Sequence, residues 1–210
     1  MLADWRNRLL GKPAFRAFAG RVWPFKLIAR RQARRLFDLS AGFVYSQVYM
    51  ACVSLDWFNR LADGPVPLAT LADEAKLPAD AARRLIKAAS TLALTELRSG
   101  DQVALGSLGA AMIGDPGIAA MAAHHHLLYA DMADPLALLR GERGDTALGD
   151  YWGYAKSAQP EQLAATDVAS YSQLMADSQP MIAEQVLSAI SLQPYRHILD
   201  VGGGVGAFLD

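Results

Sequence analysis

Apolar positions recur along most of this chain with the period of an α-helix, and they predict a mainly helical protein. From Asp38 to Leu61 apolar residues occur nearly all round the helix, which is typical of a helix buried on most sides. Gly64-Pro65 ends this stretch. Two shorter amphipathic helices are predicted from Leu68 to Lys76 and from Pro78 to about Leu92.

Two short strands are expected after these helices, Leu94 to Arg98 and Gln102 to Leu105, joined by Gly100-Asp101. A helix-turn-helix followed by a hairpin is the pattern of a winged helix. More helices are predicted further along the chain: Ser107 to Ile113, Ile118 to Leu139 with an interruption near Pro135, Glu161 to Ser178, and one that opens at Pro180 and ends before Pro194.

The segment from His197 to Asp210 changes character. A short apolar run ends in Asp200, a glycine cluster follows, and a new apolar stretch begins. This order predicts a strand, a tight turn and the start of a helix, which is how a nucleotide-type cofactor site begins in an open α/β sheet. Gly202, Gly204 and Gly206 lack Cβ atoms and let the backbone approach a ligand closely. Spacing alone leaves NAD and S-adenosylmethionine both open.

The run Asp200-Val201-Gly202-Gly203-Gly204-Val205-Gly206 resembles the first motif of class I S-adenosylmethionine-dependent methyltransferases. Its D-V-G-G-G-x-G form is similar to that of small-molecule O-methyltransferases of the caffeic-acid and acetylserotonin type. The stretches 41–48 and 124–135 resemble the bacterial carotenoid members, the hydroxyneurosporene and demethylspheroidene O-methyltransferases. The resemblance implies transfer of a methyl group from S-adenosylmethionine to a hydroxyl of a small apolar acceptor, a hydroxylated carotenoid.

The resemblance also implies a domain order, in which a winged-helix dimerisation domain precedes a Rossmann-like domain. We therefore expect a mainly α chain that leads into the truncated start of an α/β methyltransferase domain. The predicted parts are a basic aromatic arm (1–37), a winged-helix dimerisation domain (38–115), linking helices that form part of an acceptor pocket (116–195), and the first strand with its glycine-rich turn (196–210). A homodimer is expected through the helix around Phe43 to Phe58.

The resemblance assigns candidate site residues. Asp200, Gly202, Gly204 and Gly206 are expected to bind S-adenosylmethionine. The helix that contains Tyr171, Met175 and Ser178, and the segment that begins at Met121, are expected to lie beside the acceptor, with ordinary core packing as the alternative.

No catalytic residue is assigned. The family's general-base histidine lies well downstream of the glycine turn, and none of His124, His125, His126 or His197 matches it. The chain as given is therefore expected to be inactive. Three consecutive helical histidines point about 100° apart, so no metal site is expected from them.

The charge is unevenly distributed. Residues 1–37 hold ten Lys or Arg residues and one acid, a net charge of +9, whereas residues 38–210 carry a net charge of −10. The aromatic residues of the arm either dock on the core or form an interfacial segment attracted to anionic lipid. With one cysteine, no signal core and no uninterrupted run of 18 apolar residues, we expect a cytoplasmic protein with peripheral membrane contact and no membrane span.

Two other functions are open. A winged-helix DNA-binding regulator would use Arg83, Arg84 and Lys87, but the net negative charge of residues 38–210 disfavours a nucleic-acid partner. A non-catalytic dimerisation module is the other alternative.

Overall fold

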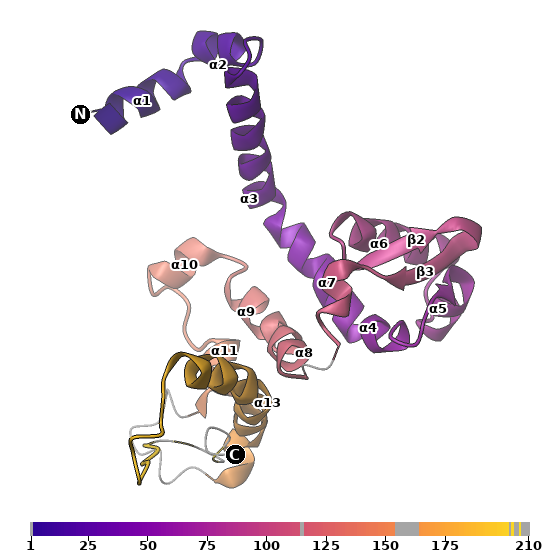
Figure 1. Ribbon diagram of the computed structural model, residues 1–210, viewed down its shortest axis with the longest axis vertical. Helices are drawn as coiled ribbons and strands as arrows, with labels where there is room; N and C mark the ends of the chain where they lie inside the picture. The colour runs from indigo at the N-terminus through magenta and orange to yellow at the C-terminus, as the bar shows by residue number, and fades with distance from the viewer. Residues whose placement is uncertain (1, 114–115, 154–163, 202, 204–205, 207–210) are drawn as a thin grey trace. The chain divides into compact units, whose positions relative to one another are not determined.

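The computed structural model describes residues 2–113, 116–153, 164–201, 203 and 206, and its elements are mostly helices (Figure 1). The mainly helical prediction is confirmed. The chain divides into two compact units, Met1–Val48 and Tyr49–Asp210. The helix α3, Phe25–Ser54, runs from the first unit into the second.

The first unit contains α1 (Leu2–Gly11), α2 (Pro13–Ala19) and the greater part of α3. Pro13 occupies the first turn of α2, where its missing N–H costs no helical hydrogen bond. The predicted boundary between residues 37 and 38 falls inside α3, because Arg, Leu, Ala and Gln favour the helix there and no proline interrupts it.

The expectation that residues 38–61 form one helix buried on most sides is wrong for the single chain. The helix ends at Ser54, and Asp56 has a left-handed backbone (φ 54°) before the short α4, Trp57–Arg60. Cys52 is the one residue of α3 that is buried. Among the described helices, α3 is also long and apolar enough to cross a membrane by length and composition, which is weak evidence by itself.

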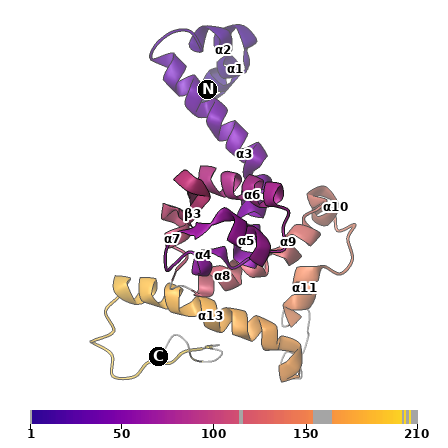
Figure 2. The same cartoon turned by 90° about the vertical axis from the view of Figure 1, so that its right-hand side faces the viewer.

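The second unit begins with a small antiparallel sheet among helices (Figures 1 and 2). Its strands β1 (Val66–Pro67), β2 (Thr95–Arg98) and β3 (Gln102–Leu105) lie in the order β1-β3-β2, with Thr95 opposite Leu105. The 3₁₀ turn η1 (Ser99–Asp101) joins the hairpin, and Gly100 there has φ +70°. The helices are α5 (Leu68–Glu74), α6 (Ala79–Thr91) and α7 (Ser107–Ala110). The helices and strands predicted between residues 68 and 105 are confirmed.

The core of this part is formed by apolar side chains from α4, α5, α6 and the sheet. Gly109 lets α7 approach the turn between α6 and β2 closely, because a Cβ on this residue would overlap the carbonyl oxygen of Leu94. The buried apolar residues are Cys52, Trp57, Phe58, Leu61, Val66, Leu68, Leu71, Ala72, Ala82, Ile86, Ala89, Leu94, Val103 and Ala104.

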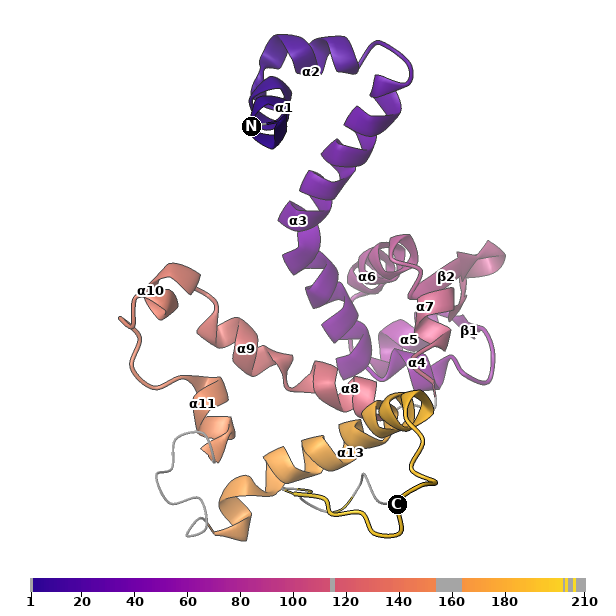
Figure 3. The same cartoon turned by 60° about the vertical axis from the view of Figure 1, so that its left-hand side comes forward.

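The helices that the structure describes after residue 115 are α8 (Pro116–Ala123), α9 (His125–Asp131), α10 (Pro135–Leu139), α11 (Ala147–Tyr151) and α13 (Ala165–Ala189) (Figure 3). The helix α13 packs against α8, and α11 packs against α9. The predicted break at Pro180 is wrong, because α13 continues through that proline. Pro180 removes one helical hydrogen bond, but buried residues anchor the helix on both sides of it, Leu174 and Ser178 before it and Ala183 after it.

The strand predicted at the start of 196–210 is not formed. Residues 197–200 have neither helix nor strand, and the apolar side chain of Leu199 is 85% exposed. A strand of a parallel sheet is stable when neighbours satisfy its backbone and cover both faces. In the part of the chain that the structure describes, the strands β1, β2 and β3 pair only with one another.

Candidate functional site

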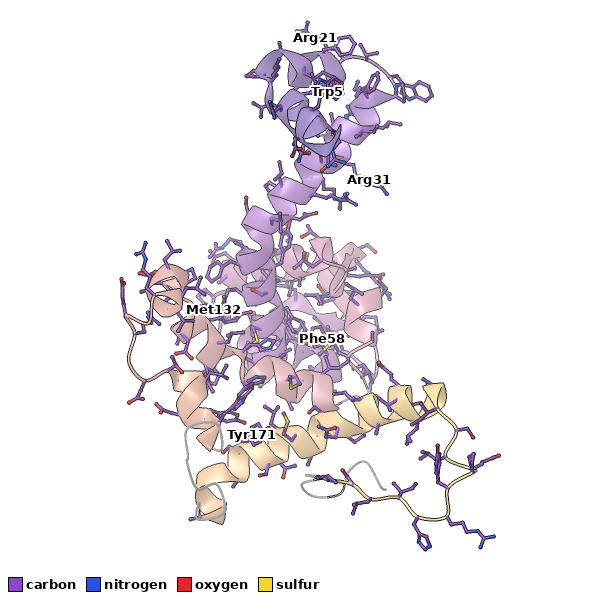
Figure 4. The ribbon with its side chains drawn as sticks, turned by 90° about the vertical axis from the view of Figure 1, so that its left-hand side faces the viewer. Trp5, Arg21, Arg31, Phe58, Met132 and Tyr171 are labelled. Atoms are coloured by element: carbon purple, nitrogen blue, oxygen red, sulfur yellow. The ribbon has the colours of Figure 1, made fainter. Side chains whose placement is uncertain are left out.

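The four residues predicted to contact an acceptor lie on two helices that pack against each other. Met121 is on α8, and Tyr171, Met175 and Ser178 are on α13 (Figure 4 labels Tyr171). Their spacing places the α13 residues on one face. The Ser178 hydroxyl donates to the carbonyl oxygen of Met175 at 3.2 Å, so it is engaged within its own helix. The structure therefore places the four positions on two helices that pack together, and it gives the Ser178 hydroxyl a hydrogen bond within α13.

Two aromatic side chains join α11 to α13. The ring of Trp152, the residue that follows α11, meets the ring of Tyr171 edge-on, with centroids 6.0 Å apart. The hydroxyl of Tyr151 donates to the backbone oxygen of Ser170 at 2.8 Å. Together these contacts place α11 against the same part of α13 that carries the acceptor candidates.

The histidine triplet belongs to this aromatic group. The His124 ring stacks on Tyr151, with centroids 6.1 Å apart and 15° between the ring planes. The ring centroids of His125 and His124 are 5.0 Å apart, and the His125 ring meets the Tyr129 ring edge-on with centroids 6.3 Å apart. His126 points back instead, with Nδ1 2.8 Å from the oxygen of Ala123. Among the described residues, no group of three His, Cys, Asp or Glu side chains could hold a metal ion.

Burial changes the ionisation of two members of this group. It lowers the pKa of His125, and the neighbouring His124 lowers that pKa further by charge repulsion. Burial also raises the pKa of Tyr151. Nδ1 of His124 is buried and has no hydrogen-bond partner within the described part of the chain. The group thus offers an aromatic surface and one polar atom, Nδ1 of His124, that can pair with a ligand.

Asp131 fixes the position of α11, a role that the sequence analysis missed. Its buried carboxylate accepts hydrogen bonds from the backbone N–H groups of Ala147 and Leu148, both at 2.8 Å. A carboxylate at a helix N-terminus satisfies orphan donors and complements the helix dipole. Arg143 adds bonds from one guanidinium nitrogen to the carbonyl oxygens of Ala130 and Asp131, at 2.8 and 2.7 Å. The sequence signal for this role was an acidic residue at the end of an apolar helix. Such residues are common on solvent-exposed surfaces, so the signal was not specific.

Within the Asp200–Gly206 turn, the structure describes Asp200, Val201, Gly203 and Gly206. Gly206 has φ +82°, and its N–H donates to the oxygen of Gly203 at 2.8 Å. A Cβ on Gly203 would overlap the carboxylate of Asp200, so a larger residue at this position would have to displace that side chain. Oδ2 of Asp200 is buried and, among the described residues, has no hydrogen-bond partner. The predicted cofactor residues Gly202 and Gly204 lie outside the described residues.

Comparisons with known proteins point to the part of the chain that holds these residues. The O-methyltransferase domain family matches residues 129–210. This segment contains Tyr129, Tyr151, Trp152 and Tyr171 of the aromatic group, and it contains the glycine turn. The demethylspheroidene O-methyltransferase of Cereibacter sphaeroides is 40% identical over 205 residues, which cover 96% of this chain and 53% of that protein. These matches relate the chain to the O-methyltransferases. The family resemblance drawn from the sequence is thereby confirmed.

Two further comparisons give a second similar sequence and a similar fold. The demethylspheroidene O-methyltransferase of Rhodobacter capsulatus is 40% identical over 182 residues, 87% of the chain and 46% of the relative. The crystal structure of human N-acetylserotonin methyltransferase in complex with SAM shares the fold, with a TM-score of 0.65, 22% identity, and coverage of 85% of this chain and 54% of that one. The chain thus spans about half the length of the curated relatives that it matches.

Proposed function

We propose that this chain supplies the acceptor-binding helices and the first part of the cofactor site of an O-methyltransferase. The enzyme would transfer the methyl group of S-adenosylmethionine to a hydroxyl of a hydroxylated carotenoid. The observation that carries the proposal is the Asp200–Gly206 turn, inside the segment that matches the family. Its buried carboxylate oxygen has no partner among the described residues, and a buried acceptor of this kind is costly unless a ligand pairs with it.

The residues of the turn fit a cationic cofactor. Gly203 and Gly206 carry no side chain, so the backbone of the turn can approach a ligand closely. The Asp200 carboxylate would hold a cationic amine of the cofactor directly or through water. When bound, S-adenosylmethionine supplies the electrophilic methyl group on a sulfonium. By the family resemblance, the general-base histidine is expected beyond the glycine turn, so we propose that residues 1–210 bind the cofactor weakly and do not turn over.

The chemistry of the α8, α11 and α13 residues suits an extended apolar acceptor. Met121 and Met175 have flexible, polarizable side chains that adapt to a ligand's shape. Trp152 and Tyr171 add a rigid aromatic surface, and Nδ1 of His124 could pair with an acceptor hydroxyl. The two relatives of 40% identity are named as demethylspheroidene O-methyltransferases, which supports a carotenoid acceptor.

The domain organisation is part of the proposal. The helix-turn-helix and hairpin between residues 68 and 105 support a winged-helix dimerisation domain over residues 38–115. In a homodimer the exposed side chains of Phe43 and Val44 on α3 would be covered. A DNA-binding regulator is less favoured, because Arg83 pairs with Asp101 through bonds of 2.7 and 2.8 Å, and Arg84 pairs with Asp80. These cations are already engaged within the molecule.

The first test measures cofactor binding to the 210-residue chain. Equilibrium dialysis with radiolabelled S-adenosylmethionine should show binding that the Gly203→Val variant loses. Gly144→Val is the matched control, because nothing lies within 4 Å of a Cβ at that position. Equal retention by wild type and Gly203→Val would contradict the proposed cofactor site.

The second test adds the part of a curated relative that lies beyond the region this chain matches. Residues 1–210 are joined to the segment of the Cereibacter sphaeroides relative that follows the matched region, and S-adenosylhomocysteine is measured with and without a hydroxylated carotenoid in detergent. Product is expected only with the acceptor. The Met175→Lys variant should raise KM, whereas Met132→Lys, an exposed methionine after α9, should not. A chimera that folds and binds cofactor but methylates no carotenoid would refute the acceptor assignment.

A further inference from the structure

The first half of α3 carries an exposed apolar stripe formed by Phe25, Ile28, Leu36 and Leu39, called the α3 stripe below. At 100° per residue these four positions fall within an arc of about 80°. Leu36 is 66% exposed and Leu39 is 80% exposed. The cations of the same helix segment lie outside this arc: Lys26, Arg30, Arg31, Arg34 and Arg35. The rest of the helix surface in this segment therefore carries these five cations, together with Asp38 and the exposed apolar residues Leu27 and Phe37.

The unit that contains this stripe has almost no core of its own. Ala19 is the one buried residue among those whose burial is described between residues 4 and 48. The ring of Phe18 lies beside those of Phe15 and Phe25, with centroid distances of 6.4 and 6.3 Å. Trp23 remains 75% exposed, and Trp5 is exposed on α1 (Figure 4 labels Trp5). So much exposed aromatic surface on a folded chain marks an interaction site.

We infer that α1, α2 and the first half of α3 form a peripheral membrane-binding unit that lies in the interface of an anionic bilayer. The α3 stripe, Trp5 and Trp23 would enter the boundary between headgroups and acyl chains, where tryptophan is favoured. The Lys and Arg side chains would reach the lipid phosphates. This placement goes beyond the proposed methyl transfer and does not depend on it, although an apolar carotenoid acceptor would reside in the same bilayer.

The positive charge of residues 1–37 favours an anionic membrane over the other partners that could cover this surface. Residues 1–37 have a net charge of +9, so a second copy docked on the α3 stripe would bring two strongly positive units together. A helix that crossed the bilayer from Phe25 would have to bury five cations in its first eleven residues, which is costly. Anionic lipid instead satisfies the apolar stripe and the positive charge at once.

The test is co-sedimentation of the 210-residue chain with vesicles of phosphatidylcholine alone or mixed with phosphatidylglycerol. Wild type should bind the mixed vesicles, lose binding at high salt, and be extracted by alkaline carbonate. Arg30→Gln/Arg34→Gln should bind the mixed vesicles about twenty- to thirtyfold more weakly, because each interfacial cation contributes about fivefold. Leu36→Glu should also lose binding. Leu139→Glu on α10 is the matched control, an 82% exposed leucine outside the unit, and it should bind like wild type.

Circular dichroism confirms that each variant keeps its helix content, and light scattering follows its oligomeric state. Equal binding to both vesicle types, or unchanged binding by Leu36→Glu, would overturn the proposal. Resistance to carbonate would show a spanning helix instead. Loss of dimer in Leu36→Glu without loss of vesicle binding would assign the stripe to a second copy, and salt-sensitive binding of DNA in place of vesicles would assign it to nucleic acid. No cofactor or acceptor is present, so failure here leaves the methyltransferase proposal standing.

Discussion

Replacing Asp131 with alanine should release the start of α11 from the end of α9. The carboxylate accepts from two backbone N–H groups, those of Ala147 and Leu148, at 2.8 Å each. A buried N–H left without a partner costs at least about 1 kcal/mol, so the pair should cost about 2 kcal/mol or more. Asp131→Asn keeps one acceptor oxygen and should cost about half as much.

Hydrogen exchange followed by mass spectrometry measures this effect where it arises. In Asp131→Ala the amides of Ala147 and Leu148 should exchange about thirtyfold faster, which corresponds to about 2 kcal/mol of lost protection. The near-ultraviolet circular dichroism should weaken as well, because α11 positions Tyr151 against His124 and Trp152 against Tyr171.

Asp134 provides the control for this prediction. Its carboxylate caps the exposed helix α10 by accepting from the N–H of Ala137 at 3.0 Å. Asp134→Ala should cost about 1 kcal/mol and leave exchange at Ala147 and Leu148 unchanged. If Asp131→Ala exchanges at these two amides no faster than Asp134→Ala does, the carboxylate does not hold α11 and the reasoning is refuted.

Three further predictions follow from local chemistry. Burial raises the pKa of the Cys52 thiol to about 12, so a disulfide reagent at about pH 8 should label it only after unfolding, and fast labelling of the native chain would contradict its burial. The pKa of His125 is lower in the folded chain than in the unfolded chain. As the pH falls, the unfolded chain is therefore protonated at this histidine before the folded chain is. Stability measured by urea should therefore fall as the pH drops below about 6.5, and His125→Gln should reduce this slope. Gly109→Ala should destabilise the second unit by about 1–3 kcal/mol in the same assay, because its Cβ would overlap the oxygen of Leu94, and an unchanged midpoint would show that the turn adapts freely.

Local patterns were sufficient for the helix pair and hairpin between residues 68 and 105. The apolar stripe of α6 at Ala82, Ile86 and Ala89 is buried as its spacing predicts, and Gly100 supplies the positive φ that the hairpin turn requires. These features depend on residues close in sequence, so reading the chain in order finds them. The family assignment from the glycine turn succeeded for the same reason, because seven consecutive residues contain the motif.

Features that depend on distant residues could not be predicted in this way. The helix α13 runs through Pro180 because both of its halves are buried, and no local signal reports that burial. The exposed face of α3 looked like a buried one, since an apolar helix has the same pattern whether it is covered by its own chain, a partner or a lipid. The segment after His197 has the composition of a strand but lacks a pairing neighbour among the described residues.

The sequence by itself thus determined the local elements, the charge division between the two ends and the family. Only the tertiary structure showed that Asp131 holds α11 and that Tyr151, His124, Trp152 and Tyr171 meet around the helices that carry the acceptor candidates. The physical reason is the range of the interactions. Helical periodicity and turn preference act within a few residues, whereas a buried carboxylate finds its donors 16 and 17 residues away, at positions set by the packing of whole helices.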